Sequence, residues 1–202
     1  MRIHVVHGIH TTQTNATVPG LVPYLQQPVY EVAHPNYGYI LAAETRRINP
    51  TIVSMLAPYI ESGDVLVGHS NGCAIIYAML DTLINAGKCP RGLVLINGAL
   101  DRKITLPAEI EWCDVYYNAG DTITEVAQIA SWLGTAPRTW GEIGHAGYDG
   151  ADPRIKNFDC GNTPDMPKVN GHSDLFTPSN LPAWGKFIGE RIASLTNLGI
   201  QP

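Results

Sequence analysis

One serine in this sequence stands in a spacing that suits nucleophilic chemistry. Ser70 lies between Gly68 and Gly72 in the pentapeptide GHSNG, with the apolar run DVLV before it and the helix-forming run CAIIYAMLDTLI after it. A serine at a tight strand-to-helix turn is held in a strained backbone conformation with its hydroxyl projecting above the sheet. Flanking glycines leave room where the strand and the helix nearly collide. We therefore interpret Ser70 as a nucleophile rather than as part of a structural turn.

An acidic partner for this serine is expected downstream. A serine hydroxyl needs a histidine to take its proton and an acid to hold that histidine in the correct tautomer. For a serine at such a turn, the order along the chain is serine, acid, histidine. Asp121 follows the strand predicted at Val115 to Tyr117 and falls at the carboxyl edge of the sheet, so we predict that it is the acid. Asp101, after the run LVLINGAL, is the alternative.

Two of the seven histidines follow Asp121 in the sequence, His145 and His172. His172 comes after the last predicted strand and before the last predicted helix, and a loop at that place can deliver an imidazole over the serine. We therefore predict that His172 is the base. His145, in GEIGHAGYDG, follows another possible strand and remains the alternative. His69 belongs to the pentapeptide itself, where its side chain should point away from that of Ser70.

Backbone N–H groups near Ser70 can stabilise the oxyanion that forms when a serine attacks a carbonyl. The N–H of Asn71 stands at the start of a helix, where the helix dipole also favours negative charge. A second donor is expected from the early turn HGIH, which follows the first apolar run. We predict the N–H of Ile9 for this role, with His10 as the alternative. If the turn is only structural, Gly8 serves to relieve crowding there.

Short apolar runs rich in Val, Ile and Tyr alternate with longer stretches of helical spacing. The runs are mostly continuous, as in strands that are covered on both faces. The predicted strands are Ile3 to Val6, Val29 to Val32, Val65 to Val67, Leu93 to Ile96, Val115 to Tyr117 and Ile155 to Asp159. This alternation predicts an α/β fold in one domain, residues 1–202, with a mainly parallel central sheet of about six or seven strands and helices on both faces.

Helical spacing marks the stretches between these strands. They are Leu21 to Gln26, Tyr39 to Ile60, Cys73 to Asn85, Thr124 to Leu133 and Pro182 to Leu195. We expect Pro50 to divide the second stretch into two helices, because proline lacks the N–H that a helix interior uses. Gly, Pro, Asp and Asn dominate residues 144–181, which we predict to be a long loop region near the site, since such loops are more often functional than idle.

The composition limits what the chain can bind. The net charge is −5 and no basic cluster extends beyond Arg46 and Arg47, so nucleic acid is not expected as a partner. No apolar run approaches membrane-spanning length and no signal peptide is visible, so we expect a protein that is cytoplasmic or otherwise soluble. The four cysteines have no C-x-x-C spacing and predict reduced thiols rather than a zinc site or a disulfide framework.

Taken together, these residues resemble the α/β-hydrolase superfamily, and within it the small, lidless bacterial lipases and esterases. The similarity rests on short islands: VVHGI, GHSNG, the strand that leads to Asp121, and GHSDLF around His172. It implies a catalytic triad of Ser70, Asp121 and His172. It also implies an oxyanion hole formed by the backbone of Ile9 and Asn71, and ester hydrolysis through an acyl-enzyme without metal or cofactor.

These features favour a serine carboxylester hydrolase that acts on small or accessible acyl esters, since 202 residues leave little chain for a cap over the cleft. A thioesterase, an amidase or an acyltransferase can use the same triad, and a non-catalytic binding member of the fold is a further alternative. His4, His7 and His10 suggest a metal site, but they straddle a strand and a turn, so no metal is predicted. The sequence departs from this family at two places. The second glycine that commonly follows such a His-Gly turn is replaced by Ile9 and His10, and residues 144–170 match no segment of the family, so the shape of the substrate is not predicted.

Overall fold

A parallel sheet runs through the middle of the molecule. The computed structural model describes residues 1–9, 17–25, 31–33, 35, 37, 38, 41–132, 134 and 137–197. Within these residues six strands form one sheet in the order β2-β1-β3-β4-β5-β6, and every neighbouring pair is parallel. The strands are β1 (Arg2–Val6), β2 (Glu31–Ala33), β3 (Val65–His69), β4 (Gly92–Ile96), β5 (Trp112–Tyr117) and β6 (Ile155–Asp159). The predicted start of the second strand, at Val29, lies outside the described residues.

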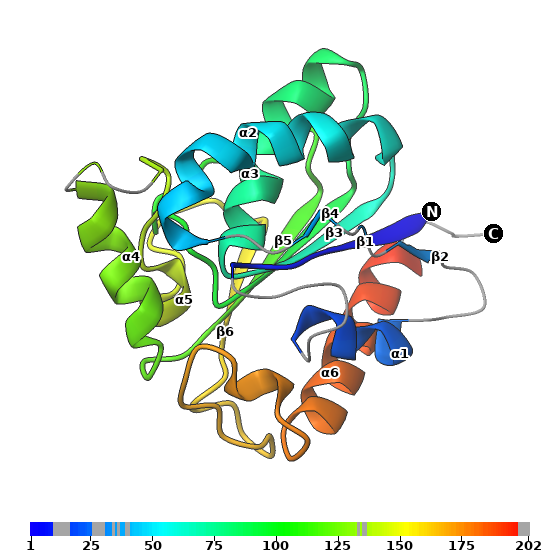
Figure 1. Cartoon of the computed structure of the whole chain (residues 1–202). Coiled ribbons are helices and arrows are strands. Elements are labelled where there is room, and N and C mark those ends of the chain that lie inside the picture. The colour runs from blue at the N-terminus through cyan, green and yellow to red at the C-terminus, as the bar shows by residue number, and fades with distance from the viewer. Residues whose placement is uncertain are drawn as a thin grey trace.

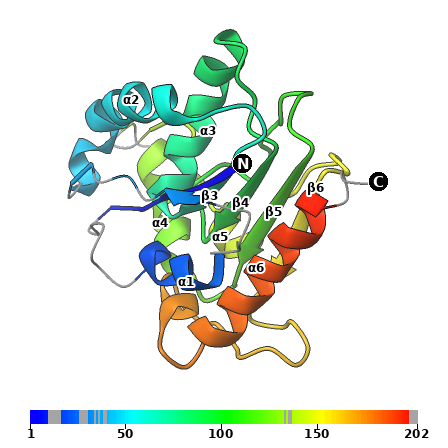
Figure 2. The ribbon, with the colours of Figure 1, turned by 90° about the vertical axis from the view of Figure 1, so that its right-hand side faces the viewer.

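Helices cover both faces of this sheet (Figures 1 and 2). One face carries α1 (Val22–Leu25) and α6 (Leu181–Asn197). The other face carries α2 (Thr45–Leu56), α3 (Asn71–Asn85), α4 (Thr122–Trp132) and α5 (Ile143–Ala146). The described 3-10 helices are η1 (Val18–Leu21), η2 (Ala42–Glu44), η3 (Ala57–Tyr59) and η4 (Asp174–Phe176). The predicted α/β fold class is therefore confirmed.

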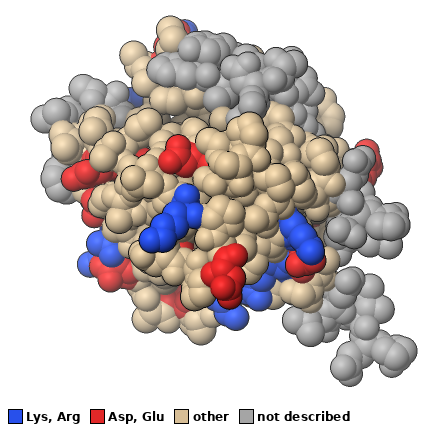
Figure 3. Space-filling view, turned by 90° about the horizontal axis from the view of Figure 1, so that it is seen from below, with Lys and Arg blue, Asp and Glu red and all other residues tan. Residues whose placement is uncertain are grey.

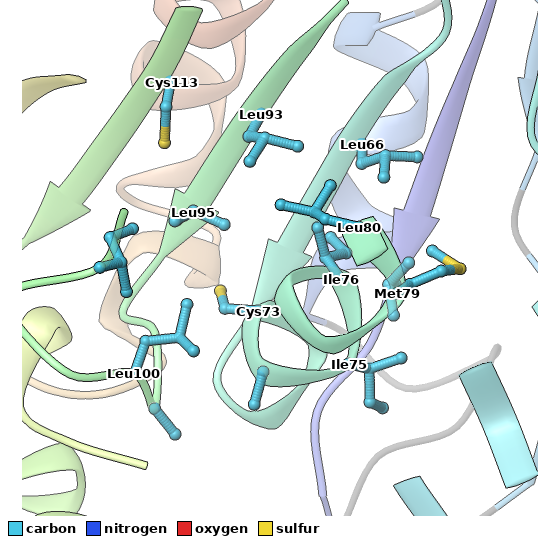
Figure 4. Close-up of a cluster of buried hydrophobic side chains, with 14 of the residues drawn as sticks. Leu66, Cys73, Ile75, Ile76, Met79, Leu80, Leu93, Leu95, Leu100 and Cys113 are labelled. Atoms are coloured by element: carbon cyan, nitrogen blue, oxygen red, sulfur yellow. The ribbon is translucent and has the colours of Figure 1, made fainter. Parts of the chain in front are cut away.

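Side chains that alternate along each strand build a separate core on each face of the sheet. On the α3 face, strand and helix residues pack together, as Figure 4 shows for Leu66, Leu93, Leu95, Cys73, Ile76 and Leu80. On the opposite face, Val65, Val67 and Ile96 belong to the same core as Trp184 of α6. Because both faces are covered, the central strands β3 and β4 appear as continuous apolar runs in the sequence. The sheet thus holds the carboxyl end of β3 between its neighbours β1 and β4.

Helix α2 does not divide at Pro50, and that prediction is wrong. The helix runs without a break over Thr45–Leu56. Pro50 is exposed, and its missing N–H removes one hydrogen bond, the one that would reach the carbonyl oxygen of Arg46. The opposite face of the helix stays packed in the core through Ile52, Val53 and Leu56. Burial of this face therefore outweighs the loss of a single hydrogen bond.

The region 144–181 contains regular structure between its loops. It includes the end of α5, the predicted strand β6 and the short helix η4. Loops join these elements, and one of them carries His172. The region is thus a set of connections at the edge of the sheet rather than one long loop.

The surface carries charges of both signs. On the face seen in Figure 3, acidic and basic side chains are interspersed among uncharged residues. In the part of the chain that the structure describes, no helix is long and apolar enough to cross a membrane. All four cysteines are free thiols, and Cys73, Cys113 and Cys160 are buried.

Candidate active site

Ser70 occupies the junction between β3 and α3. Because β3 ends at His69 and α3 begins at Asn71, a single residue turns the chain from strand to helix. Ser70 has φ 56° and ψ −127°, a backbone conformation that residues with a Cβ rarely adopt. Its carbonyl oxygen accepts hydrogen bonds from the backbone N–H groups of Cys73 and Ala99, both at 3.1 Å. These two contacts hold the strained turn.

Close packing requires the two glycines of the pentapeptide. A Cβ on Gly68 would lie 2.8 Å from Cδ1 of Ile76, inside the normal contact distance. A Cβ on Gly72 would collide with the backbone carbonyl oxygen of Val6 on β1. Residues without a side chain therefore let α3 start directly above the sheet, as the GHSNG spacing predicted.

His172 and Asp121 form a hydrogen-bonded pair across 51 positions of sequence. Asp121 lies in the turn between β5 and α4 and is fully buried. Nδ1 of His172 is 2.9 Å from Oδ1 and 2.9 Å from Oδ2 of Asp121. An ionised carboxylate can only accept, so Nδ1 carries the proton, and in the neutral ring Nε2 is left as the acceptor. The predicted acid and the predicted base are thus side by side.

The environment of Asp121 keeps this carboxyl group ionised. Burial by itself raises the pKa of Asp121. Hydrogen bonds from His172 and from Nδ2 of Asn97, at 2.9 Å, lower it, and the backbone N–H of Thr124 adds a third at 3.2 Å. Together these bonds outweigh the burial, so the pKa of Asp121 lies below its usual value. A negative charge beside His172 at neutral pH follows.

Asn97 is a site residue that the sequence reasoning missed. It follows β4 directly, is fully buried and has a positive φ of 44°. Its place at the carboxyl end of a buried strand is the signal that singled out Asp121, and the same signal could have found it. Asp101, the alternative acid, is exposed and accepts the backbone N–H of Lys103 at 2.7 Å, as turn aspartates do. The structure therefore brings His172 to Asp121 and leaves Asp101 in a turn.

His69 connects the end of β3 to the loop that carries His172. Its Nε2 donates a 2.9 Å hydrogen bond to the backbone carbonyl oxygen of His172, and the two rings lie 4.8 Å apart. Its ring also meets the edge of Phe176, with centroids 4.8 Å apart. Burial, together with the neighbouring His172, lowers the pKa of His69 to about 3, so its ring is neutral. His69 thus acts as a fixed donor that holds the His172 backbone.

His145, the alternative base, lies on α5 without such a partner. Its Nδ1 is buried and has no hydrogen-bond partner among the described residues, and the imidazole bonded to Asp121 is that of His172. His172 pairs with Asp121, whereas its described hydrogen bonds include none to the hydroxyl of Ser70. Catalytic hydrogen bonds are often long before substrate binds, so the pairing with Asp121 is the stronger indication of the base.

The turn after β1 passes directly against Ser70. A Cβ on Gly8 would lie 2.8 Å from Cβ and 3.2 Å from Oγ of Ser70. On the other side of this turn, Tyr37 stacks on His7 with ring centroids 3.9 Å apart, and its hydroxyl donates to the backbone carbonyl oxygen of His7. The early His-Gly turn is therefore fixed in contact with the serine.

The N–H groups predicted as oxyanion donors belong to residues beside these contacts. Asn71 is the first residue of α3, and the first turn of a helix has N–H groups without an acceptor inside the helix. Ile9 is half-buried and follows Gly8. The alternative donor, His10, lies outside the described residues.

Comparison with known proteins shows which fold this is. No family model matches the chain, and no curated protein matches its sequence. The ydeN gene product of B. subtilis is similar in structure, with a TM-score of 0.57 and 16% identity over 96% of this chain and 97% of that chain. A proposed hydrolase of the α/β superfamily from Xanthomonas campestris pv. campestris has a TM-score of 0.56 and 15% identity, over 96% and 98% of the two chains. The chain has the α/β-hydrolase fold.

A proposed esterase from Staphylococcus aureus is also similar in structure, with a TM-score of 0.54 and 13% identity over 95% of this chain and 75% of that chain. At these identities the likeness is one of fold. In an α/β-hydrolase fold the site lies at the carboxyl ends of the strands. Ser70, Asp121 and His172 follow β3, β5 and β6 and so belong to that edge.

The histidines at the start of this α/β-hydrolase fold have other contacts. Nε2 of His4 is 2.9 Å from Oδ2 of Asp64, and both residues are buried. His7 stacks on Tyr37. Among the described residues, no three or more His, Cys, Asp or Glu side chains gather as a metal site would require.

Proposed function

We propose that the chain is a serine carboxylester hydrolase that acts through an acyl-enzyme. In this proposal Ser70 is the nucleophile, His172 is the general base and then the general acid, and Asp121 orients the imidazole. The backbone N–H groups of Ile9 and Asn71 form the oxyanion hole.

The reaction would proceed in two halves. Nε2 of His172 takes the proton of the Ser70 hydroxyl as Oγ attacks the ester carbonyl carbon, and the N–H groups of Ile9 and Asn71 stabilise the oxyanion. The intermediate collapses, the alcohol leaves with the proton from His172, and Ser70 keeps the acyl group. A water molecule then gives a proton to His172 and attacks the acyl carbon, and the acid leaves as Ser70 recovers its proton.

One observation carries this proposal: Nδ1 of His172 donates to Asp121, and His69 ties the loop of His172 to the strained serine turn. The bond to Asp121 fixes the tautomer in which Nε2 accepts. The lowered pKa of Asp121 keeps the negative charge that stabilises the imidazolium formed during the reaction. His4 also pairs with a buried carboxylate, that of Asp64, so the carboxylate partner alone is not decisive; what supports the role of His172 is that His69 ties its loop to the strained serine turn.

We propose small or solvent-accessible acyl esters as the substrates. The described helices of the chain all belong to the layers of the sheet or to its short connections, which leaves little chain for a cap. The similarity to a proposed esterase supports an ester as the first substrate to test.

The test is a panel of p-nitrophenyl esters of increasing acyl length, run beside thioester and amide analogues. We expect the wild type to turn over short-chain esters, and Ser70→Ala to lower kcat by about 10³-fold or more. Ser54→Ala is the matched control, since Ser54 is an exposed serine of α2 whose hydroxyl donates to the carbonyl of Pro50. Unchanged turnover in Ser70→Ala would remove Ser70 from the mechanism. Faster turnover of the thioester or the amide would change the substrate class but not the triad.

A further inference from the structure

A cluster of three polar side chains lies inside the apolar core beneath the serine turn. Asn49 of α2, Asn71 of α3 and Trp140, which precedes α5, are 7%, 0% and 7% exposed. Their apolar neighbours in the same core include Val53, Ala74 and Ile143. Buried polar groups destabilise a fold unless they are hydrogen-bonded, so this cluster needs a reason.

The two asparagine side chains form a reciprocal pair. Nδ2 of Asn49 donates to Oδ1 of Asn71 at 2.8 Å, and Nδ2 of Asn71 donates to Oδ1 of Asn49 at 3.0 Å. Nε1 of Trp140 donates to the same Oδ1 of Asn71 at 3.1 Å. Because the indole N–H can only donate, it identifies that atom of Asn71 as the oxygen, and the orientation of both amides follows.

This pair bears on one particular peptide group. The carbonyl of Ser70 and the N–H of Asn71 belong to the same planar unit. The carbonyl end is held by the N–H groups of Cys73 and Ala99. The other end is held through the Asn71 side chain, which three hydrogen bonds fix in the core. The direction of the Asn71 N–H is therefore set from both ends.

Packing alone does not call for these amides. Replacing two hydrogen-bonded partners with apolar groups of similar shape can leave stability nearly unchanged, whereas hydrogen bonds fix direction as apolar contacts do not. The cluster also joins segments that are far apart in the sequence, since Asn49 and Trp140 are 22 and 69 positions from Asn71. Both segments converge on the residue after the serine.

We propose that Asn49 is a positioning residue for the oxyanion hole, which it fixes through the side chain of Asn71, with Trp140 as the second support. This inference rests on the proposed function, because it assigns the Asn71 N–H to the oxyanion. Asn49 touches no substrate atom. Its effect is on the position of the Asn71 N–H when the carbonyl oxygen of the substrate becomes negative.

The test is steady-state kinetics of Asn49→Leu with the best ester of the panel. We expect kcat to fall by about 10- to 100-fold while KM stays within about twofold, because a misdirected donor is lost mainly in the transition state. Val53→Ala is the matched control, a cavity on the same buried face of α2. It should lower the melting temperature and leave kcat within about twofold. Equal kcat in Asn49→Leu and the wild type, or equal loss of kcat in Val53→Ala, would overturn the proposal.

A second pair of variants applies if Asn49→Leu does not fold. Trp140→Phe removes one N–H donor and little volume, and we expect it to lower kcat by about 10-fold. Trp184→Phe is its control, because Trp184 is a buried tryptophan whose Nε1 donates to the carbonyl of Pro167 at 2.9 Å. Equal kcat in the two variants would contradict the positioning role. If the wild type is active and depends on Ser70, such a result removes only this role, whereas an activity that is independent of Ser70 removes the proposed function itself.

Discussion

Ser70 limits which residues can stand next to it. Its φ of 56° is kept by the surrounding contacts, since strain of this kind persists only where neighbours hold it. Gly8 comes so close that any side chain there would meet the serine. The site therefore depends on the absence of a side chain at Gly8 as much as on the groups that react.

Gly8→Ala tests this steric limit. We expect kcat for p-nitrophenyl acetate to fall by about 10- to 100-fold, because the added methyl group displaces the Ser70 side chain. Gly161→Ala is the control, since a Cβ there meets nothing closer than 3.3 Å. A Gly8→Ala enzyme with wild-type kcat would mean that the His-Gly turn does not press on the reactive hydroxyl.

Two aspartates give a matched comparison of the acid. We expect Asp121→Asn to lower kcat by about 10³- to 10⁴-fold, because an amide no longer holds His172 in the tautomer whose Nε2 accepts. Asp101→Asn should leave kcat within about twofold, since Asp101 is an exposed turn residue. The measurement is initial rates of ester hydrolysis at neutral pH. Comparable losses in both variants would contradict the assignment of the acid.

Helix α2 positions Asn49 beside Asn71, the residue that follows Ser70. The helix does so with a proline in its second turn, whose position leaves the carbonyl of Arg46 without its usual helical donor. The apolar side of α2 keeps the helix in place against α3. Tertiary packing, rather than the helix propensity of its residues, keeps α2 helical through Pro50.

Pro50→Ala should therefore stabilise the protein. Alanine restores the N–H that reaches Arg46, while it gives back some entropy to the unfolded chain, so we expect a net gain of about 2 kcal/mol in the free energy of unfolding. Urea unfolding measures it, with Thr51→Ala as the control at the next exposed position of α2. A loss of stability in Pro50→Ala would show that the proline fits this helix better than alanine does.

The sequence predicted elements well where burial is strong on both faces. The runs at β3 and β4 were recognised because continuous Val, Leu and Ile residues are typical of a covered parallel sheet. The division of α2 at Pro50 was wrong because the cost of one missing hydrogen bond is local, whereas the packing of Ile52 and Val53 that outweighs it is tertiary.

Across the described part of the molecule, three histidines are buried: His4, His7 and His69. Burial lowers the pKa of His69 to about 3, and it also lowers the pKa values of His4 and His7. Between pH 6.5 and about 3, the unfolded chain binds a proton at His69 that the folded chain does not. The free energy of unfolding should therefore decrease as the pH falls through this window.

His69→Gln tests this linkage, because a Gln side chain keeps an N–H donor but does not titrate. We expect the wild type to lose stability from pH 6.5 downward, with about 1 kcal/mol per pH unit of the slope due to His69, and the variant to lose it less steeply. Asp121, with its lowered pKa, adds its own loss only below about pH 4. Thermal melts from pH 7 to pH 4 give both slopes, and parallel curves would contradict a neutral, buried His69.

The sequence also predicted the pairing of His172 with Asp121, because chain order and strand ends constrain where an acid and a base can lie; the catalytic roles of these residues and of Ser70 stay predictions. It did not lead to Asn49 or Trp140, since their contact with Asn71 depends on which helices pack together. A polar residue on an otherwise apolar helix face, as Asn49 is beside Ile52, Val53 and Leu56, was the one signal available.

Covalent labelling by a fluorophosphonate, followed by peptide mass spectrometry, tests the central claim most directly, because the reagent reacts with a serine only where a base activates it and donors receive the oxyanion. We predict a single adduct on Ser70, absent in Ser70→Ala and formed far more slowly in His172→Ala. An active protein that stays unlabelled, carries the adduct on another residue, or labels Ser70 equally fast without His172 would contradict it.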